Sequence, residues 1–219
     1  VLVALRQWWA ALDRVQRGLI MLMVARWALA LLFVSNILPL ELRDGWLLYH
    51  GAGEEHIFAL AQSLARGAPE PSVVGIAQPL VMLPWMPLLK ADSFADIIVP
   101  LVLINGFLLG GLSVSVMGSI ARQLLKNDQV ALWSAGVWAF LPLLAYLGFF
   151  WYDNPSPEIV RSAAVPKLGW LNGLTDGPAT FFIMVAVLLL AQLSAQPEKG
   201  LFWRMACAGA TMSVAMQTI

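Results

Sequence analysis

The sequence has little charge, no excess of either sign and almost no cysteine. Charged residues make up 12% of its 219 residues, whereas roughly 25% is typical of soluble domains. Lys and Arg number 13, as do Asp and Glu, so no net positive charge recruits a nucleic acid or another polyanion. The single cysteine, Cys207, permits neither an internal disulfide bond nor a cysteine-based metal cluster. These shortages exclude a disordered chain, a disulfide scaffold and a nucleic-acid-binding arm.

Apolar residues are abundant instead: they make up 60% of the chain, and the mean hydropathy is +0.76. A helix needs about 20 such residues to cross the hydrocarbon core of a bilayer. We expect an all-α fold, a polytopic transmembrane helix bundle that forms a single transmembrane domain over 1–219 and belongs to a longer chain. The expected spans are 18–40, 97–125, 130–150, 177–195 and 201–219.

A sixth apolar stretch, 73–89, carries Pro79, Pro84 and Pro87. Proline at this density breaks the backbone hydrogen bonds that a helix needs in lipid. We therefore expect this stretch not to span the membrane but to fold back as an interfacial element. A short amphipathic helix is expected just before it, at 54–66, where apolar residues recur at helical spacing and Gly67 stops the helix.

The charge distribution favours one orientation. If 73–89 does not span, seven Lys and Arg side chains face one side of the membrane and five face the other, whereas a spanning 73–89 would give six against six. By the positive-inside rule, the N-terminus is then cytoplasmic, and loops 41–96 and 151–176 lie outside. Nearly all acidic residues, together with His50 and His56, lie in these two outer loops. We expect a site to be assembled there.

Several motifs in this arrangement resemble a known superfamily. They are Gly53-Glu54-Glu55-His56-Ile57, Ala61-Gln62-Ser63-Leu64, Gln78-Pro79-Leu80, 119–125 followed by 131–142, and 174–182. In order and spacing they are similar to the GT-C membrane glycosyltransferases, which include protein O-mannosyltransferases and aminoarabinose transferases. The resemblance implies sugar transfer from a polyprenyl-phosphate donor to an acceptor on the extracytoplasmic side of a bacterial cytoplasmic (inner) membrane.

Such a transfer needs a carboxylate that takes the proton of the acceptor hydroxyl, and positive charge or a metal that stabilises the leaving phosphate. Glu54 or Glu55 is the candidate base. Arg161 or Lys167, from the second outer loop, is expected to hold the phosphate. His56 is expected to assist, or to ligate a divalent metal together with Asp176, in a site whose cofactors the sequence does not specify.

Other interpretations remain open for the same residues. The family's first acid falls on Gly53, so a non-catalytic accessory subunit of a larger membrane complex is the alternative function, with membrane lipid and other complex subunits as partners and no nucleic acid. Acids such as Glu54 and Glu55 also favour the first turn of any helix, and Asp176 before Gly177 is typical of a helix cap. Arg26, within the first span, is expected to face protein because a lone charge in lipid is costly.

Overall fold

The structure, a computed structural model, describes residues 2–35, 37–38, 52–68, 77–151, 169–171, 176–195 and 201–216. All regular structure within these ranges is helical, as expected. Four helices are long and apolar enough to cross a membrane, namely Arg14–Val34, Phe94–Leu125, Asp128–Gly148 and Gly177–Ser194. The all-α class is therefore confirmed for the described part of the chain, and its helices have the length and composition of a multi-pass membrane protein.

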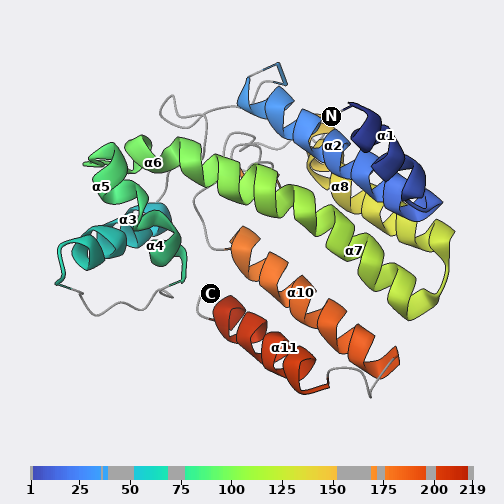
Figure 1. Cartoon of the computed structure of the whole chain (residues 1–219). Helices are drawn as coiled ribbons and strands as arrows, with labels where there is room; N and C mark the ends of the chain where they lie inside the picture. Colours follow the sequence, from blue (N-terminus) through green and yellow to red (C-terminus); the bar gives the residue numbers. More distant parts are fainter. Residues whose placement is uncertain are drawn as a thin grey trace.

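The arrangement of the helices is shown in Figure 1. Their bounds are α1 Leu2–Ala11, α2 Arg14–Val34, α3 Ala52–Ala65, α4 Ala77–Met82, α5 Trp85–Leu89, α6 Phe94–Leu101, the π-helix η2 Val102–Leu109, α7 Gly110–Leu125, α8 Asp128–Trp151, α10 Asp176–Ala195 and α11 Leu201–Met216. The elements α6, η2 and α7 form one continuous span of 32 residues, which we call the long span.

Two helix starts differ from the expected bounds because side chains cap them. The Asp13 carboxylate accepts a hydrogen bond from the Gln16 backbone N–H, and the Asp13 backbone N–H donates to Gln16 Oε1, so α2 begins at Arg14 instead of residue 18. Ser93 and Asp96 form a second capping box, which starts α6 three residues before the expected 97. The first span also ends earlier than expected, at Val34 instead of residue 40.

The long span lies at the centre of the helix packing. Its α7 part packs against α2 and α8 on one side and against α10 on another, and α11 packs against α10 (Figure 1). Small residues make these approaches close: Ala135 and Ala139 of α8 are fully buried in one cluster with Leu19. Gly118 lies opposite the same leucine, and a methyl group there would overlap it.

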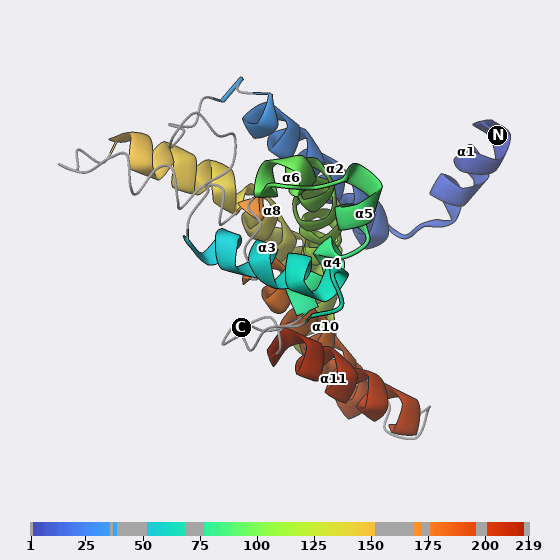
Figure 2. The same ribbon diagram turned by 90° about the vertical axis from the view of Figure 1, so that its left-hand side faces the viewer.

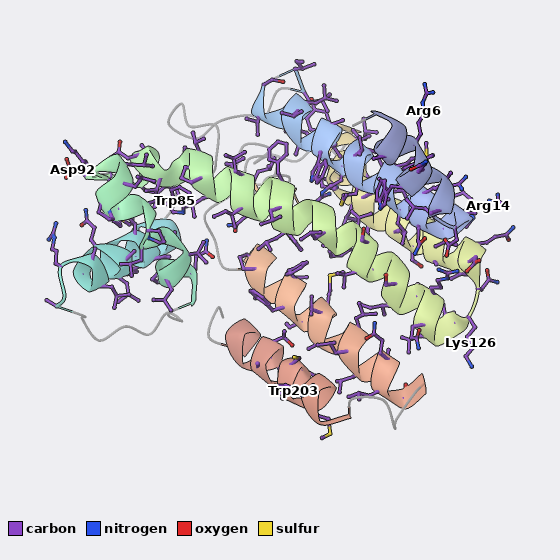
Figure 3. The ribbon with its side chains drawn as sticks, viewed as in Figure 1. Arg6, Arg14, Trp85, Asp92, Lys126 and Trp203 are labelled. Atoms are coloured by element: carbon purple, nitrogen blue, oxygen red, sulfur yellow. The ribbon has the colours of Figure 1, made fainter. Side chains whose placement is uncertain are left out.

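Ion pairs join three helices at one end of the bundle. Arg122, in the last turn of α7, lies 3.1 Å from the Asp13 carboxylate and 2.9 Å from that of Asp128, which begins α8. We call this the Arg122 end. Arg14 and Lys126 lie at it, whereas Trp85 and Asp92 lie at the opposite end (Figure 3).

Short helices gather around the start of the long span. Buried side chains of α3, α4, α5 and α6 form one hydrophobic cluster, which we call the α3–α6 cluster; its members are Ile57, Phe58, Ala61, Met82, Met86, Ala91, Phe94, Ile97 and Leu101. Viewed toward this cluster, α3 lies across the direction of the long span (Figure 2). The described part of the proline-rich stretch forms α4 and α5, of six and five residues, and neither is long enough to span.

The helix expected at 54–66 is α3, which begins two residues earlier and ends at Ala65. The predicted stop is confirmed, because Gly67 follows in a left-handed conformation with φ 71°. The amphipathic pattern also has its expected effect: Ile57, Leu60 and Ala61 are buried, and α3 packs against α4, α5 and α6.

Candidate functional site

The α3–α6 cluster packs on the start of the long span. The strongly apolar part of this span begins at Ile97, and about 20 helical residues are enough to cross a hydrocarbon core of about 30 Å. Lys90 and Asp92 come just before the span begins, and Asp92 lies at the end of the bundle opposite Lys126 (Figure 3).

Three candidate residues occupy the first turns of α3. Glu54, Glu55 and His56 are consecutive helical residues, and the side chains of Glu55 and His56 are exposed. The Glu54 side chain lies outside the described part. Phe58 anchors this end of α3 to α6 through a perpendicular ring contact with Phe94, at a centroid distance of 6.4 Å. The packing therefore fixes the helix and leaves Glu55 and His56 facing outward.

Asp176 begins α10 at a different place along the long span. The next residue, Gly177, is buried against Trp170, and Trp170 in turn approaches Gly106 and Gly110 where η2 meets α7. α10 therefore begins beside the middle of the long span, whereas α3 packs on its α6 part. In Figure 1 both lie toward the end of the bundle opposite Arg122.

The remaining candidates fall outside the described residues. Arg161 and Lys167 lie in 152–168, and the side chain of Asp176 is not described. Within the described ranges, no three His, Cys, Asp or Glu side chains come together as a metal site requires. His56 and Asp176 therefore stay a sequence prediction as metal ligands, without a third donor among the described side chains.

Arg26 is a charged residue buried inside the helix bundle. Arg26 is 3% exposed and donates from Nη1 to the Ala139 carbonyl of α8 at 3.1 Å. The expectation that Arg26 faces protein is confirmed, because its side chain is buried against α8.

Two tryptophans donate hydrogen bonds to the π-helical region and to the start of α7. Trp27 Nε1 donates to the Phe107 carbonyl of η2 at 2.6 Å. Trp138 Nε1 donates to Ser113 Oγ at 2.8 Å, and that hydroxyl donates to the Gly110 carbonyl at 2.7 Å. These side-chain donors add to the backbone hydrogen bonds where η2 meets α7, since the Gly110 N–H also donates to the Phe107 carbonyl.

A groove in the α3–α6 cluster was not anticipated from the sequence. It has a volume of about 520 Å³ and lies between the end of α3 and the α5–α6 connection; its lining is Gln62, Leu64, Ala65, Arg66, Leu83, Met86, Pro87, Lys90, Ala91 and Asp92. Arg66 follows the last residue of α3, and Lys90 caps α5 with φ 50°. In the sequence, each of these residues is recognisable only as a cation at the end of a helix. Tertiary packing brings Arg66 and Lys90 to the same groove.

Comparisons with protein-family models, with curated proteins and with solved structures gave no match to this chain.

Proposed function

We propose that the protein is a membrane glycosyltransferase of GT-C type, which transfers a sugar from a polyprenyl-phosphate donor to an acceptor on the extracytoplasmic side of a bacterial cytoplasmic membrane. In this proposal Glu54 or Glu55 takes the proton of the acceptor hydroxyl as its oxygen attacks the anomeric carbon. Arg161 or Lys167 holds the phosphate that leaves, and His56 and Asp176 assist by binding substrate or a divalent metal. The N-terminus is cytoplasmic.

The observation that supports this proposal best is the position of α3. Its first turns carry the Glu-Glu-His sequence, and it packs against α6 at the start of the long span, with Glu55 and His56 exposed. A base that acts on a lipid-linked donor needs this level, because the phosphate of such a donor lies among the headgroups while its hydrocarbon tail stays in the membrane.

A second candidate function is an accessory subunit of a larger membrane complex. It is favoured by Gly53, which stands where the family resemblance places its first acid. In this case α3 and the bundle serve as a scaffold, and the acids of the first turn act only as favourable charges at a helix start.

A sugar-transfer assay on the full chain distinguishes the two functions. Purified protein is added to membranes that contain acceptor, together with polyprenyl-phosphate hexose or pentose donors, and transfer of labelled sugar is measured. The double variant Glu54→Gln/Glu55→Gln is expected to lose transfer by at least about 100-fold, since a positioned general base typically contributes 10²–10⁴. The control Glu41→Gln/Glu70→Gln removes the same charge from the same loop and is expected to keep activity.

Undiminished transfer by the Glu54→Gln/Glu55→Gln variant would eliminate these residues as the base. Absence of transfer by the wild-type protein with every donor, together with stoichiometric co-purification with other membrane proteins in mild detergent, would establish the accessory function instead. Size-exclusion profiles of all variants show whether a loss of activity reflects unfolding.

A further inference from the structure

The groove of the α3–α6 cluster combines an apolar lining with two cations. Leu64, Leu83, Met86 and Pro87 supply the apolar part, and Arg66 and Lys90 supply the charge. Its volume of about 520 Å³ lies within the ~300–1,000 Å³ that is usual for small-molecule sites. A water-soluble anion alone needs no apolar wall, so this lining points to an amphiphilic ligand.

The two cations are available to a ligand. Arg66 and Lys90 are exposed, and among the described residues the ion pairs involve Arg122 with Asp13 and Asp128, not these two cations. The Asp92 carboxylate lines the same groove, so the three side chains together carry one net positive charge. One negative charge on a ligand neutralises this groove, whereas a second would be repelled by Asp92.

The position of the groove decides where the ligand comes from. Its residues belong to α3, α5 and the turns that flank them, and Lys90 and Asp92 come just before Phe94, where the apolar long span begins. At this level a membrane phospholipid presents its phosphate, and its acyl chains continue into the core beside the long span. A cationic rim with apolar walls at the headgroup level is complementary to that molecule.

We propose that this groove binds the headgroup of an anionic bilayer phospholipid with one negative charge, of the phosphatidylglycerol type. The phosphodiester lies between Arg66 and Lys90, and the first carbons of the lipid lie against Leu83 and Met86. The lipid fixes the α3–α6 cluster at the membrane surface. This proposal does not rest on sugar transfer, and it holds equally for an enzyme and for an accessory subunit.

The test uses the full chain in a neutral maltoside detergent and three soluble probes: dihexanoyl phosphatidylglycerol, dihexanoyl phosphatidylcholine and inorganic phosphate. Binding is measured by titration calorimetry. We expect saturable binding of the phosphatidylglycerol probe, at least about fivefold tighter than that of the other two, since exposed charge pairs contribute modestly to binding.

The chain offers a matched control for the charge variants. Lys126 caps α7 as Lys90 caps α5, in the same left-handed conformation with φ 50°, but it lies at the Arg122 end. The variant Arg66→Gln/Lys90→Gln is expected to bind the phosphatidylglycerol probe about fivefold more weakly, and each single replacement is expected to give part of this loss. Arg6→Gln/Lys126→Gln removes the same charge and is expected to bind as the wild type does.

Each other outcome contradicts the proposal. Equal loss in both double variants would mean that overall charge, not the groove, attracts the lipid. Phosphatidylcholine binding as tightly as phosphatidylglycerol would remove the role of net charge, and inorganic phosphate binding as tightly as the lipid would make this a site for free phosphate. Absence of saturable binding by any probe would leave the groove without the proposed ligand.

Discussion

At the scale of single residues, glycine and tryptophan determine how closely the helices approach. Trp170 is 5% exposed and adopts φ 57°, a left-handed conformation that a residue with a large side chain keeps only when its surroundings enforce it. Gly106, Gly110 and Gly177 provide these surroundings, and the Trp138 ring lies against Trp170 at 6.2 Å. These contacts hold residues 169–171 against the long span, and Trp170 in turn contacts Gly177 at the start of α10.

The first prediction concerns Gly177. A Cβ atom there lies 2.8 Å from Trp170 Cγ and 3.1 Å from Trp170 Cβ, and the position of Trp170 Cβ is fixed by its backbone. We expect Gly177→Ala to lower the free energy of unfolding by about 1–3 kcal/mol, as overpacking typically does. Gly136→Ala is the control, because its Cβ meets only Leu22 at 4.0 Å and alanine favours a helix. Thermal unfolding in detergent compares them, and equal midpoints would contradict this account.

The second prediction concerns pH and Asp13. The Gln16 backbone N–H holds the pKa of Asp13 below its ordinary value of 3.8, and Arg122 lowers it further. Near and below pH 3.8 the unfolded chain therefore binds more protons than the folded one, so this contribution to stability is complete at higher pH and is lost as the pH falls through the folded pKa.

We expect Asp13→Asn to reduce the fall of the unfolding midpoint on acidification. Asp92→Asn is the control, because Asp92 is exposed and belongs to neither ion pair of the Arg122 end. Unfolding midpoints measured from neutral pH to pH 3 test this, and the same pH dependence in wild type and Asp13→Asn would contradict it.

At the scale of the element, the long span is held in its irregular form by side chains of neighbouring helices. Pro100 and the π-helix η2 interrupt a run that otherwise has the composition of an ordinary transmembrane helix. Trp27 of α2 donates to a carbonyl of η2, while Ser113 and Trp138 continue the hydrogen bonding into α7. The irregular helix is therefore a product of the packing between α2, α8 and the long span.

The third prediction follows from this dependence. Trp27→Phe removes the indole donor to the partly buried Phe107 carbonyl, to which the Gly110 backbone N–H also donates. We expect the loss of this one hydrogen bond to cost about 0.5–1.5 kcal/mol of stability. Trp133→Phe also removes an indole N–H, but Trp133 is 76% exposed and its replacement is expected to have little effect. Similar unfolding midpoints for the two variants would show that the η2 carbonyl does not depend on Trp27.

At the scale of the whole molecule, polar groups gather at two ends separated by apolar helices. The ion pairs of Arg122 form one end, and the α3–α6 cluster with its groove forms the other; Lys126 marks the first end and Asp92 the second (Figure 3). The exposed apolar side chains between them include Met21, Leu31, Val99, Leu103, Trp133, Val137 and Leu144. Such a surface is stable in a bilayer and unfavourable in water.

The fourth prediction tests the two ends directly. In a Cys207→Ser background, Asp92→Cys and Lys126→Cys are expected to react with a membrane-impermeant maleimide from opposite sides of sealed vesicles, because these residues lie at opposite ends of the bundle. Lys126→Cys is expected to react from the cytoplasmic side. Reaction of both from the same side would contradict the crossing of the long span.

Much of this architecture could be predicted from local sequence. Continuous apolar runs placed the four long helices, and the amphipathic pattern with Gly67 predicted α3 and its end. Prolines 79, 84 and 87 predicted that their stretch does not form a spanning helix. The helix starts were missed by a few residues, although Asp13 with Gln16 and Ser93 with Asp96 are visible as capping pairs. Of the candidate site, the sequence predicted that Glu54 and Glu55 lie in the first turn of α3, followed by His56, but it did not bring Arg66 and Lys90 together.

The sequence by itself determined that the protein suits a lipid environment and which helices can cross it. The reason is that the free energy of transferring an apolar run into lipid depends on the composition and length of that run. Only the tertiary structure decided the π-helical form of the long span, the left-handed Trp170 and the groove with two cations. Each of these depends on contacts between side chains far apart in the chain, and hydropathy and periodicity carry no information about such pairs.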